Sequence, residues 1–426
     1  MSKSMWRILP LILMAYVIAY MDRVNVSFAA IQMNVDLNFS ATAYGLGGGL
    51  FFLGYGLFEI PSGAMAVRFG PRQWLARIMI TWGLLAAGMM FIRTPMHFYI
   101  MRFVLGVAEA GFFPGLIYFF GGWFPTAFRG RALSRIYIAP ALASVVMGSI
   151  SGSLLNLDGV NGWQGWQWLF LAQGLPAVVM GLVLLRFLPD SPATVPWLTD
   201  PEKAWLQGEL ARDAALIGQP ERHNILATLA NPMVLLIGMT GFLLNGASFG
   251  LTLSAPAVLT ARAGLDTHQI GHLVTAGGII GAICILVAGW NSDRHGDRLR
   301  DAFACSIIFG IALGMIGIGA TAGIVIIGYL LFAALFFTIG VLLISAYADV
   351  LPVRQLAVGC GAINTLWQFG SFLSPFAFGA AKDATGSYHA GLVGSSIVAF
   401  VLAGYILYVR ARVMANRRTR LVALAA

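Results

Sequence analysis

Twelve long apolar segments dominate this sequence and constrain its fold more than any other feature. Each is long enough to cross about 30 Å of hydrocarbon as a helix that rises about 1.5 Å per residue. The segments lie at about residues 8–32, 44–66, 74–92, 97–122, 132–156, 168–188, 232–260, 268–290, 302–319, 322–346, 357–380 and 388–410. The sequence therefore predicts an all-α membrane protein with 12 transmembrane helices.

The composition supports this class and excludes a soluble protein. Of the 426 residues, 59% are hydrophobic and 10% are charged, and the apolar segments are too many for a single anchor. The first segment carries Asp22 and Arg23 and leads straight into the fold, so no cleavable signal peptide is expected.

A polar interval divides the segments into two sets of six. It contains several prolines and mixed charges, which predict a linker with one short amphipathic helix on the membrane surface. We therefore expect a six-helix bundle over residues 1–188, a linker over 189–230, a second six-helix bundle over 231–410 and a basic tail over 411–426.

The basic residues predict the orientation of the chain. Of the 26 Lys and Arg residues, Arg93, Arg262 and Lys382 fall on one side of the layout, and Arg23 and Arg102 fall within spans. All the others share the side of the two termini and the linker, which the positive-inside rule makes cytoplasmic. The net charge of +9 is thus a topology signal, and no nucleic-acid partner is expected.

Four charged residues lie deep within the predicted spans of the first half. Arg102 and Glu109 are seven residues apart, which is about 10 Å along one helix face, and Asp22 and Arg23 lie within the first span. Such residues are costly in a bilayer and usually face the protein interior or a wet pathway. They predict a lined cavity, and the alternative is a buried ion pair that only holds helices together.

The second half carries neutral polar side chains instead of deep charges. Asn245 lies in the seventh predicted span, and Asn364, Trp367 and Gln368 lie in the eleventh. Amides within a span can bind a ligand or form hydrogen bonds between helices, and the sequence leaves both readings open.

A repeated loop supports the division into halves. GAMAVRFGPR, from Gly63, follows the second span, and GWNSDRHGDR, from Gly289, follows the eighth. Here the chain resembles the major facilitator superfamily, which implies two six-helix bundles around a central cavity. The resemblance implies gating roles for Arg68, Asp293 and Arg294, although Val67 replaces the acidic residue in the first copy.

Several further strings narrow the resemblance. DRVNVSFA, FFLGYGLFEIPSG, RFVLGVAEAGFFPG, WFPTAFRGRA and FLPDSPATVPWLT are similar to the anion:cation symporter family, and in particular to its bacterial tartrate, phthalate, hydroxyphenylacetate and galactonate permeases. The resemblance implies proton and carboxylate sites at Asp22, Arg23, Arg102 and Glu109. Tyr20 and Tyr55, together with Phe51, Phe113 and Trp367, are the aromatic residues expected around the substrate.

Charge counting suggests a mechanism that does not depend on the family. With both acids ionised, each arginine has a carboxylate, and one proton frees one arginine to bind a substrate carboxylate in a bidentate manner. Opposite charge pairs Asp22 with Arg102 and Arg23 with Glu109, with Asp22 as the proton switch and Glu109 as a second proton site. This predicts proton-coupled uptake of an organic acid, with an aromatic or hydroxylated monocarboxylate slightly favoured over a dicarboxylate.

Other functions have weaker support in the sequence. Cysteines and histidines show no metal-ligand pattern, so we expect no metal, no cofactor other than protons and no enzyme activity. We expect a monomer in the bacterial inner membrane whose partners are an organic anion, protons and lipid. A proton-driven efflux antiporter is the alternative, although two buried arginines favour an anionic substrate over a cationic drug.

Overall fold

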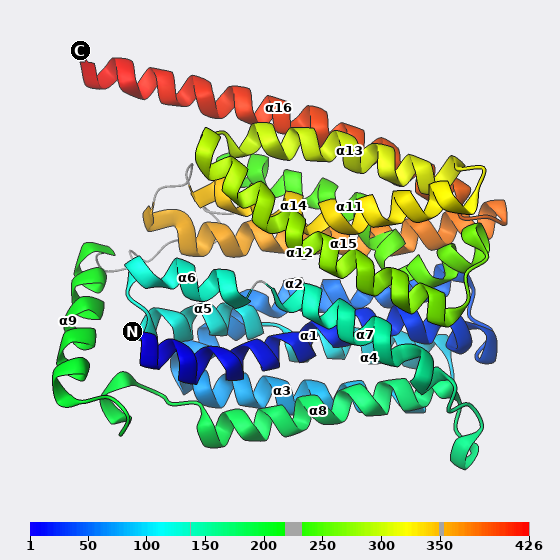
Figure 1. Cartoon of the computed structure of the whole chain (residues 1–426), viewed down its shortest axis with the longest axis horizontal. Coiled ribbons are helices and arrows are strands. Elements are labelled where there is room, and N and C mark those ends of the chain that lie inside the picture. The colour runs from blue at the N-terminus through cyan, green and yellow to red at the C-terminus, as the bar shows by residue number, and fades with distance from the viewer. Residues whose placement is uncertain (137, 218–231, 349–352, 426) are drawn as a thin grey trace. The chain divides into compact units, whose positions relative to one another are not determined.

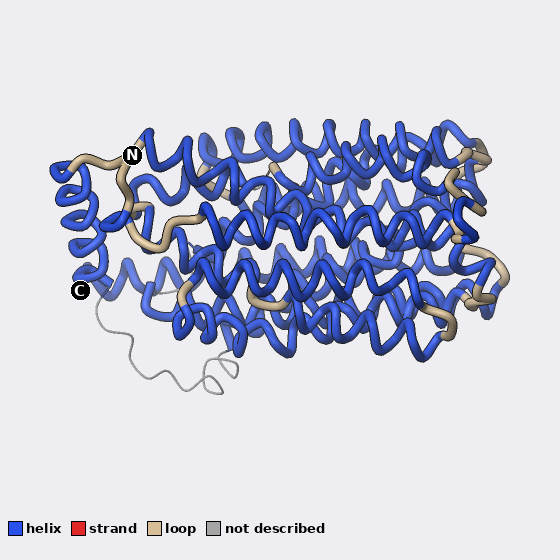
Figure 2. The backbone as a smooth tube through the Cα atoms, turned by 90° about the horizontal axis from the view of Figure 1, so that it is seen from below, coloured by secondary structure: helices blue, strands red, loops and turns tan. Residues whose placement is uncertain are grey.

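The computed structural model describes residues 1–136, 138–217, 232–348 and 353–425. Every described element is a helix (Figure 2). The chain divides into two compact units: unit 1 comprises Met1–Phe39 and Leu50–Arg222, and unit 2 comprises Ser40–Gly49 and His223–Ala426. The start of the second long helix therefore belongs to unit 2, while the rest of that helix belongs to unit 1.

Unit 1 contains the helices of the first half and of the linker. These are α1 (Ser2–Asp36), α2 (Ala41–Phe69, from Leu50 onward), α3 (Pro71–Gly88), η1 (Met89–Phe91), α4 (Pro95–Glu109), α5 (Phe112–Trp123), α6 (Thr126–Ile136), α7 (Ala139–Leu155), η2 (Val160–Gly162), α8 (Gly165–Phe187), η3 (Pro192–Thr194) and α9 (Asp200–Ile217). Helix α3 packs along α8, and α1 packs along α7 and α8.

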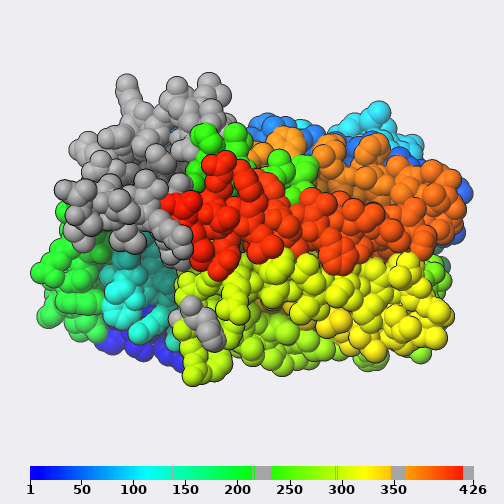
Figure 3. All heavy atoms as spheres, turned by 90° about the horizontal axis from the view of Figure 1, so that it is seen from above, coloured from blue at the N-terminus to red at the C-terminus, as the bar shows by residue number. Residues whose placement is uncertain are grey.

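Unit 2 contains the helices of the second half. These are α11 (Pro232–Ala263), α12 (Thr267–His295), α13 (Arg298–Ile318), α14 (Ala322–Ala348), α15 (Val353–Thr385) and α16 (His389–Ala425). The closest pairings are α11 with α15 and α13 with both α14 and α16. Figure 3 shows the α13–α16 pairing, with α13 in yellow beside α16 in red.

The helices match the predicted spans. Eleven are long and apolar enough to cross a membrane among the described residues. The remaining predicted span, the eleventh, at 357–380, lies within α15, and the side chains of 353–360 are outside the described residues. The predicted tail continues α16 as helix to Ala425.

The fourth predicted span is not one helix. Helix α4 ends at Glu109, Ala110 is extended, and Gly111 adopts the left-handed conformation, with φ of 86°, before α5 begins at Phe112. The predicted span at 97–122 is therefore confirmed as Pro95–Trp123, but it is interrupted at Ala110 and Gly111. Pro114 is the physical reason, because it has no N–H to donate to the carbonyl four residues earlier.

The linker helix α9 lies across the end of unit 1 at which α1 begins (Figure 1). Lys3 Nζ lies 2.8 Å from Glu202 Oε1, and the hydrogen bond from Lys3 lowers the pKa of Glu202 to about 2. Asp213 accepts hydrogen bonds from the backbone and the hydroxyl of Thr126, at 2.6 and 2.9 Å. The part of the predicted linker after residue 217 lies outside the described residues up to residue 231.

Glycines bring α2 and α4 into close contact in unit 1. A Cβ at Gly106 would overlap the carbonyl oxygen of Phe51, and one at Gly54 would overlap that of Phe103. This close approach sets the positions of Phe51 and Tyr55, whose side chains form part of the candidate site described below.

Replacing Gly106 with alanine should therefore destabilise the protein. The new Cβ would force α2 and α4 apart, and overpacking of this kind costs about 1–3 kcal/mol. Thermal unfolding in detergent measures the effect. Gly121→Ala is the matched control, because no atom lies within 4 Å of a Cβ at that position. An equal loss of stability in both variants would contradict this account.

Candidate functional site

An ion pair between α1 and α4 forms the centre of the candidate site. Arg23 Nε and Nη2 both donate to Oε1 of Glu109, at 2.8 and 2.5 Å. This is the Arg23–Glu109 pairing that opposite charge predicts. The second oxygen of Glu109, Oε2, is buried and accepts no hydrogen bond within the described part of the chain.

Aromatic rings surround the guanidinium of Arg23. Its Cζ lies 5.2 Å from the ring centre of Tyr20, 5.0 Å from that of Tyr55 and 6.0 Å from that of Phe51. The Cζ of Arg102 lies 4.6 Å from the centre of the same Phe51 ring. Ring faces carry partial negative charge and attract cations, so Phe51 helps to hold both arginines in this apolar bundle.

Asp22 forms a second buried polar group on α1. Its Oδ1 accepts from Asn25 Nδ2 at 3.1 Å, and its Oδ2 accepts no hydrogen bond within the described residues. Arg102 acts on Asp22 electrostatically, and Trp82 lies close to it. Asp22 thus has a direct hydrogen bond to Asn25 in addition to its electrostatic interaction with Arg102, and the pairing of Asp22 with Arg102 stays a prediction. The bond to Asn25 is local, since Asn25 lies three residues further along the same helix face.

The four charged residues differ in exposure. The side chain of Arg23 is 23% exposed, whereas that of Glu109 is 1% exposed. Asp22 and Arg102 are also buried, at 3% and 1% exposed. Arg23 is therefore the member of this group that a molecule outside the bundle can reach.

Of the polar residues predicted for a site in unit 2, Asn245 is bonded between helices. Asn245 of α11 donates to the Trp367 carbonyl at 3.1 Å and to Ser371 Oγ at 2.9 Å, both on α15. These bonds use both amide hydrogens of Asn245 and favour its structural reading. Asn364 and Gln368 lie on α15 at helical spacing with Ser371, and both side chains are partly exposed.

The two copies of the repeated loop contain the predicted gating residues. Arg68 stacks on Phe69 and Arg294 stacks on Trp290, with the guanidinium carbons 5.5 and 5.6 Å from the ring centres. The side chain of Asp293 lies outside the described residues.

The second loop also contains a bond that sequence reasoning missed. Asp297 Oδ2 accepts from Arg410 Nε and Nη2 of α16, at 2.9 and 2.7 Å. Burial opposes ionisation here, but the hydrogen bonds from Arg410 and from the Arg300 backbone lower the pKa of Asp297. The position of Asp297 in the repeated loop could have marked it as a candidate, but no local sequence pattern indicated Arg410 as its partner.

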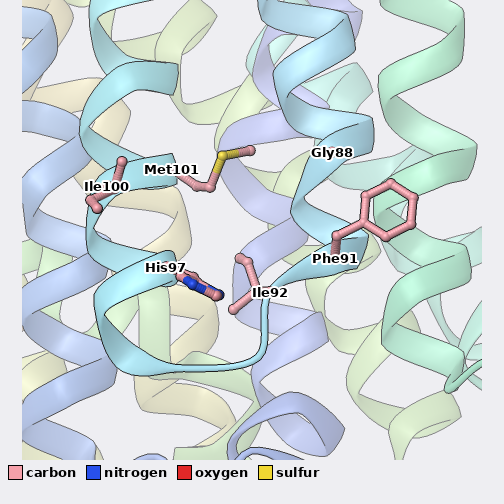
Figure 4. A pocket seen from close by; sticks show the side chains of 6 residues that line it. All are labelled: Gly88, Phe91, Ile92, His97, Ile100 and Met101. Atoms are coloured by element: carbon pink, nitrogen blue, oxygen red, sulfur yellow. The ribbon is translucent and has the colours of Figure 1, made fainter.

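A surface hollow at the η1–α4 turn does not belong to the charged site. It has a volume of about 230 Å³ and is lined by Gly88, Phe91, Ile92, His97, Ile100 and Met101 (Figure 4). None of the four charged residues of the site lines it. In the described part of the chain, no group of three or more His, Cys, Asp or Glu residues could hold a metal ion.

Comparison with known proteins identifies the family. The sequence matches the Major Facilitator Superfamily over residues 12–375. The chain belongs to the major facilitator superfamily. It is 37% identical over 398 residues to a putative tartrate transporter of Agrobacterium vitis, covering 92% of this chain and 87% of that protein. It is 36% identical over 415 residues to a quinolone resistance transporter of Acinetobacter baumannii, covering 95% and 94%.

A solved structure agrees with the fold of this superfamily. A bacterial homologue of the human lysosomal transporter Spinster, in an inward-facing and unoccupied conformation, aligns with a TM-score of 0.74. It covers 96% of this chain and 97% of that protein at 15% identity. The protein is therefore a multi-pass membrane transporter of the major facilitator type, and the similarity to tartrate transporters agrees with the anion:cation symporter resemblance.

Two amide substitutions should separate structural from binding roles in unit 2. Asn245→Ala removes two interhelical hydrogen bonds, which are worth about 0.6 to 1.7 kcal/mol in membrane proteins, and should lower the melting temperature. Gln368→Ala should leave the melting temperature unchanged and weaken the stabilisation that a transported substrate provides. Unaltered stability in Asn245→Ala would contradict its structural role.

Proposed function

We propose that this transporter is a proton-coupled symporter that takes up an organic carboxylate anion by alternating access. The observation that carries the proposal is the group of four charged residues within the spans of unit 1, two arginines and two carboxylic acids, of which Asp22, Arg102 and Glu109 are buried and Arg23 is partly exposed. Buried ions are a poor route to stability, so a bundle that keeps them is better explained by transport chemistry.

The arginines support an anionic substrate. A guanidinium presents a planar set of donors that fits a carboxylate in a bidentate manner. Arg23 is partly exposed and lies among Tyr20, Phe51 and Tyr55, so a substrate carboxylate bound there would have aromatic rings beside it. This environment favours an aromatic or hydroxylated monocarboxylate, and the relative named a putative tartrate transporter supports a hydroxylated acid.

The ion pair supports coupling to protons. Arg23 is occupied by Glu109 while that carboxylate is ionised. Protonation of Glu109 would release Arg23 to a substrate carboxylate, so proton and anion binding become linked and reciprocal. This assigns the switch to Glu109 and a second proton site to Asp22, whereas the sequence alone favoured Asp22. The exposure of Arg23 and the burial of Arg102 are the reasons for the change.

The proposal also covers the cofactor, the oligomeric state, the membrane and the gating residues of the symporter. A symporter of this kind needs no cofactor beyond the coupling proton, and we propose that it acts as a monomer in the bacterial inner membrane. Arg68, Asp293 and Arg294 are proposed to gate the cytoplasmic side through the two repeated loops.

Proton-driven efflux is the second candidate, because one relative is named a quinolone resistance transporter. Reconstitution in proteoliposomes with an imposed pH gradient separates the two functions. Labelled tartrate, a labelled aromatic monocarboxylate and a quinolone serve as the three test substrates. Uptake of a carboxylate down the proton gradient supports symport. Quinolone movement against the proton flux, with no carboxylate counterflow, would replace symport by efflux.

Glu109→Gln should uncouple transport from protons. The neutral amide mimics the protonated acid and leaves Arg23 available to the substrate. We expect counterflow exchange to persist with little pH dependence, while accumulation driven by a proton gradient falls to background. The measurement is counterflow and gradient-driven uptake of the same labelled acid.

Asp22→Asn is the matched comparison for this test. It also removes one buried carboxylate, but it leaves the Arg23–Glu109 pair intact. We expect it to retain the pH dependence of substrate binding. Loss of that dependence in Asp22→Asn, with normal behaviour in Glu109→Gln, would return the switch to Asp22.

A further inference from the structure

A side chain from α2 holds the break between α4 and α5. Ser62 Oγ donates to the carbonyl oxygen of Ala110 at 2.6 Å and accepts from Trp74 Nε1 of α3 at 3.1 Å. Ser62 and Ala110 are buried. The residue directly after Glu109 is therefore tied to two other helices through one hydroxyl group.

The residues that follow the helix break are suited to the hydrogen bond from the Ser62 hydroxyl. In a continuous helix, the N–H of residue 114 would bond to the carbonyl of Ala110, but Pro114 has no N–H. A buried carbonyl left without a donor is costly, and Ser62 supplies the donor. Gly111 has a positive φ, and a Cβ there would overlap Ser62, so the close approach requires glycine.

Trp74 connects this bond to the first repeated loop. It is the fourth residue of α3 and follows that loop directly. Its ring stacks on Phe69 with centres 5.6 Å apart, and the guanidinium carbon of Arg77 lies 3.9 Å from its ring centre. Trp74 therefore joins the turn at Gly70, between the end of α2 and the start of α3, to Ser62 and through it to the break beside Glu109.

We infer that Ser62 is a positioning residue through which the loop Gly63–Arg72 sets the position of Glu109 relative to Arg23. The inference deepens the proposed function and rests on it for its link to transport. The charged and titratable groups around Glu109 are Asp22 and Arg23 of α1, Tyr55 of α2 and Arg102 of α4. Ser62 is uncharged, so its removal alters geometry and leaves every one of these charges in place.

Hydrogen exchange tests the structural half of the inference. Ser62→Ala leaves the Ala110 carbonyl without its donor, so the amides around residues 109–113 should exchange about tenfold faster. Trp74→Phe keeps the ring but removes the N–H, and it should change the same amides to a smaller degree. The matched control is Ser144→Ala, which removes a hydroxyl that donates to the Pro140 carbonyl in α7 at 3.0 Å. Unchanged local exchange in both Ser62→Ala and Trp74→Phe would overturn the inference.

The pH profile tests the functional half. A loosened Glu109 should retreat from Arg23 and accept a proton more readily. The midpoints of gradient-driven uptake and of melting temperature against pH should therefore move to higher pH in Ser62→Ala, by about 0.5 unit or more. Ser144→Ala should keep both midpoints.

The two readouts separate the inference from the proposed function. Proton-driven uptake with wild-type midpoints in Ser62→Ala would overturn the positioning role and leave symport standing. A shifted melting midpoint in a protein that shows no proton-driven uptake would refute symport and leave the positioning role standing.

Discussion

The ion pair between Arg23 and Glu109 is the interaction on which the rest of unit 1 depends. It lies in a transmembrane helix bundle, where an unpaired charge costs several kcal/mol. Neighbouring side chains and helix contacts offset this cost. Three aromatic rings face Arg23, and the glycine contacts between α2 and α4 fix the positions of two of them, Tyr55 beside Arg23 and Phe51 beside both arginines.

The two units differ in the kind of polar side chain that they bury. Unit 1 buries the charged residues Asp22, Glu59, Arg102 and Glu109, while Asn245 in unit 2 bonds to the neighbouring helix through neutral groups. A transporter with this division would carry its proton chemistry in one bundle and use the other for neutral recognition of the substrate. Proton binding and substrate binding are linked in such a transporter. The substrate affinity would then depend on the protonation of the carboxylic acids in unit 1 alone.

The two repeated loops are anchored by different interactions. In the first copy, Trp74 follows the loop and bonds to Ser62, which holds the helix break beside Glu109. In the second copy, Asp297 bonds to Arg410 of α16. The two copies of the repeat therefore differ physically: Trp74 after the first copy is bonded through Ser62 to the helix break next to Glu109, and Asp297 of the second copy ties the start of α13 to α16.

The sequence by itself determined the class, the division into halves and the identity of the four charged residues within the spans. These follow from chain length, apolar spans and the high cost of charge in hydrocarbon, which are local properties of a segment. The partner of Arg23 was also predictable, because Arg23 is the one cation deep within the first predicted span and opposite charge matches it to Glu109. Only the tertiary structure decided that Asn245 is used between helices and that Ser62 of α2 bonds to the carbonyl of Ala110 where α4 stops. Each of these depends on which side chain from a distant part of the chain comes within hydrogen-bond distance, and no local pattern encodes that. The break illustrates the limit: Pro114 signalled a bend, but Ser62 and Trp74 made it a stable gap in the helix.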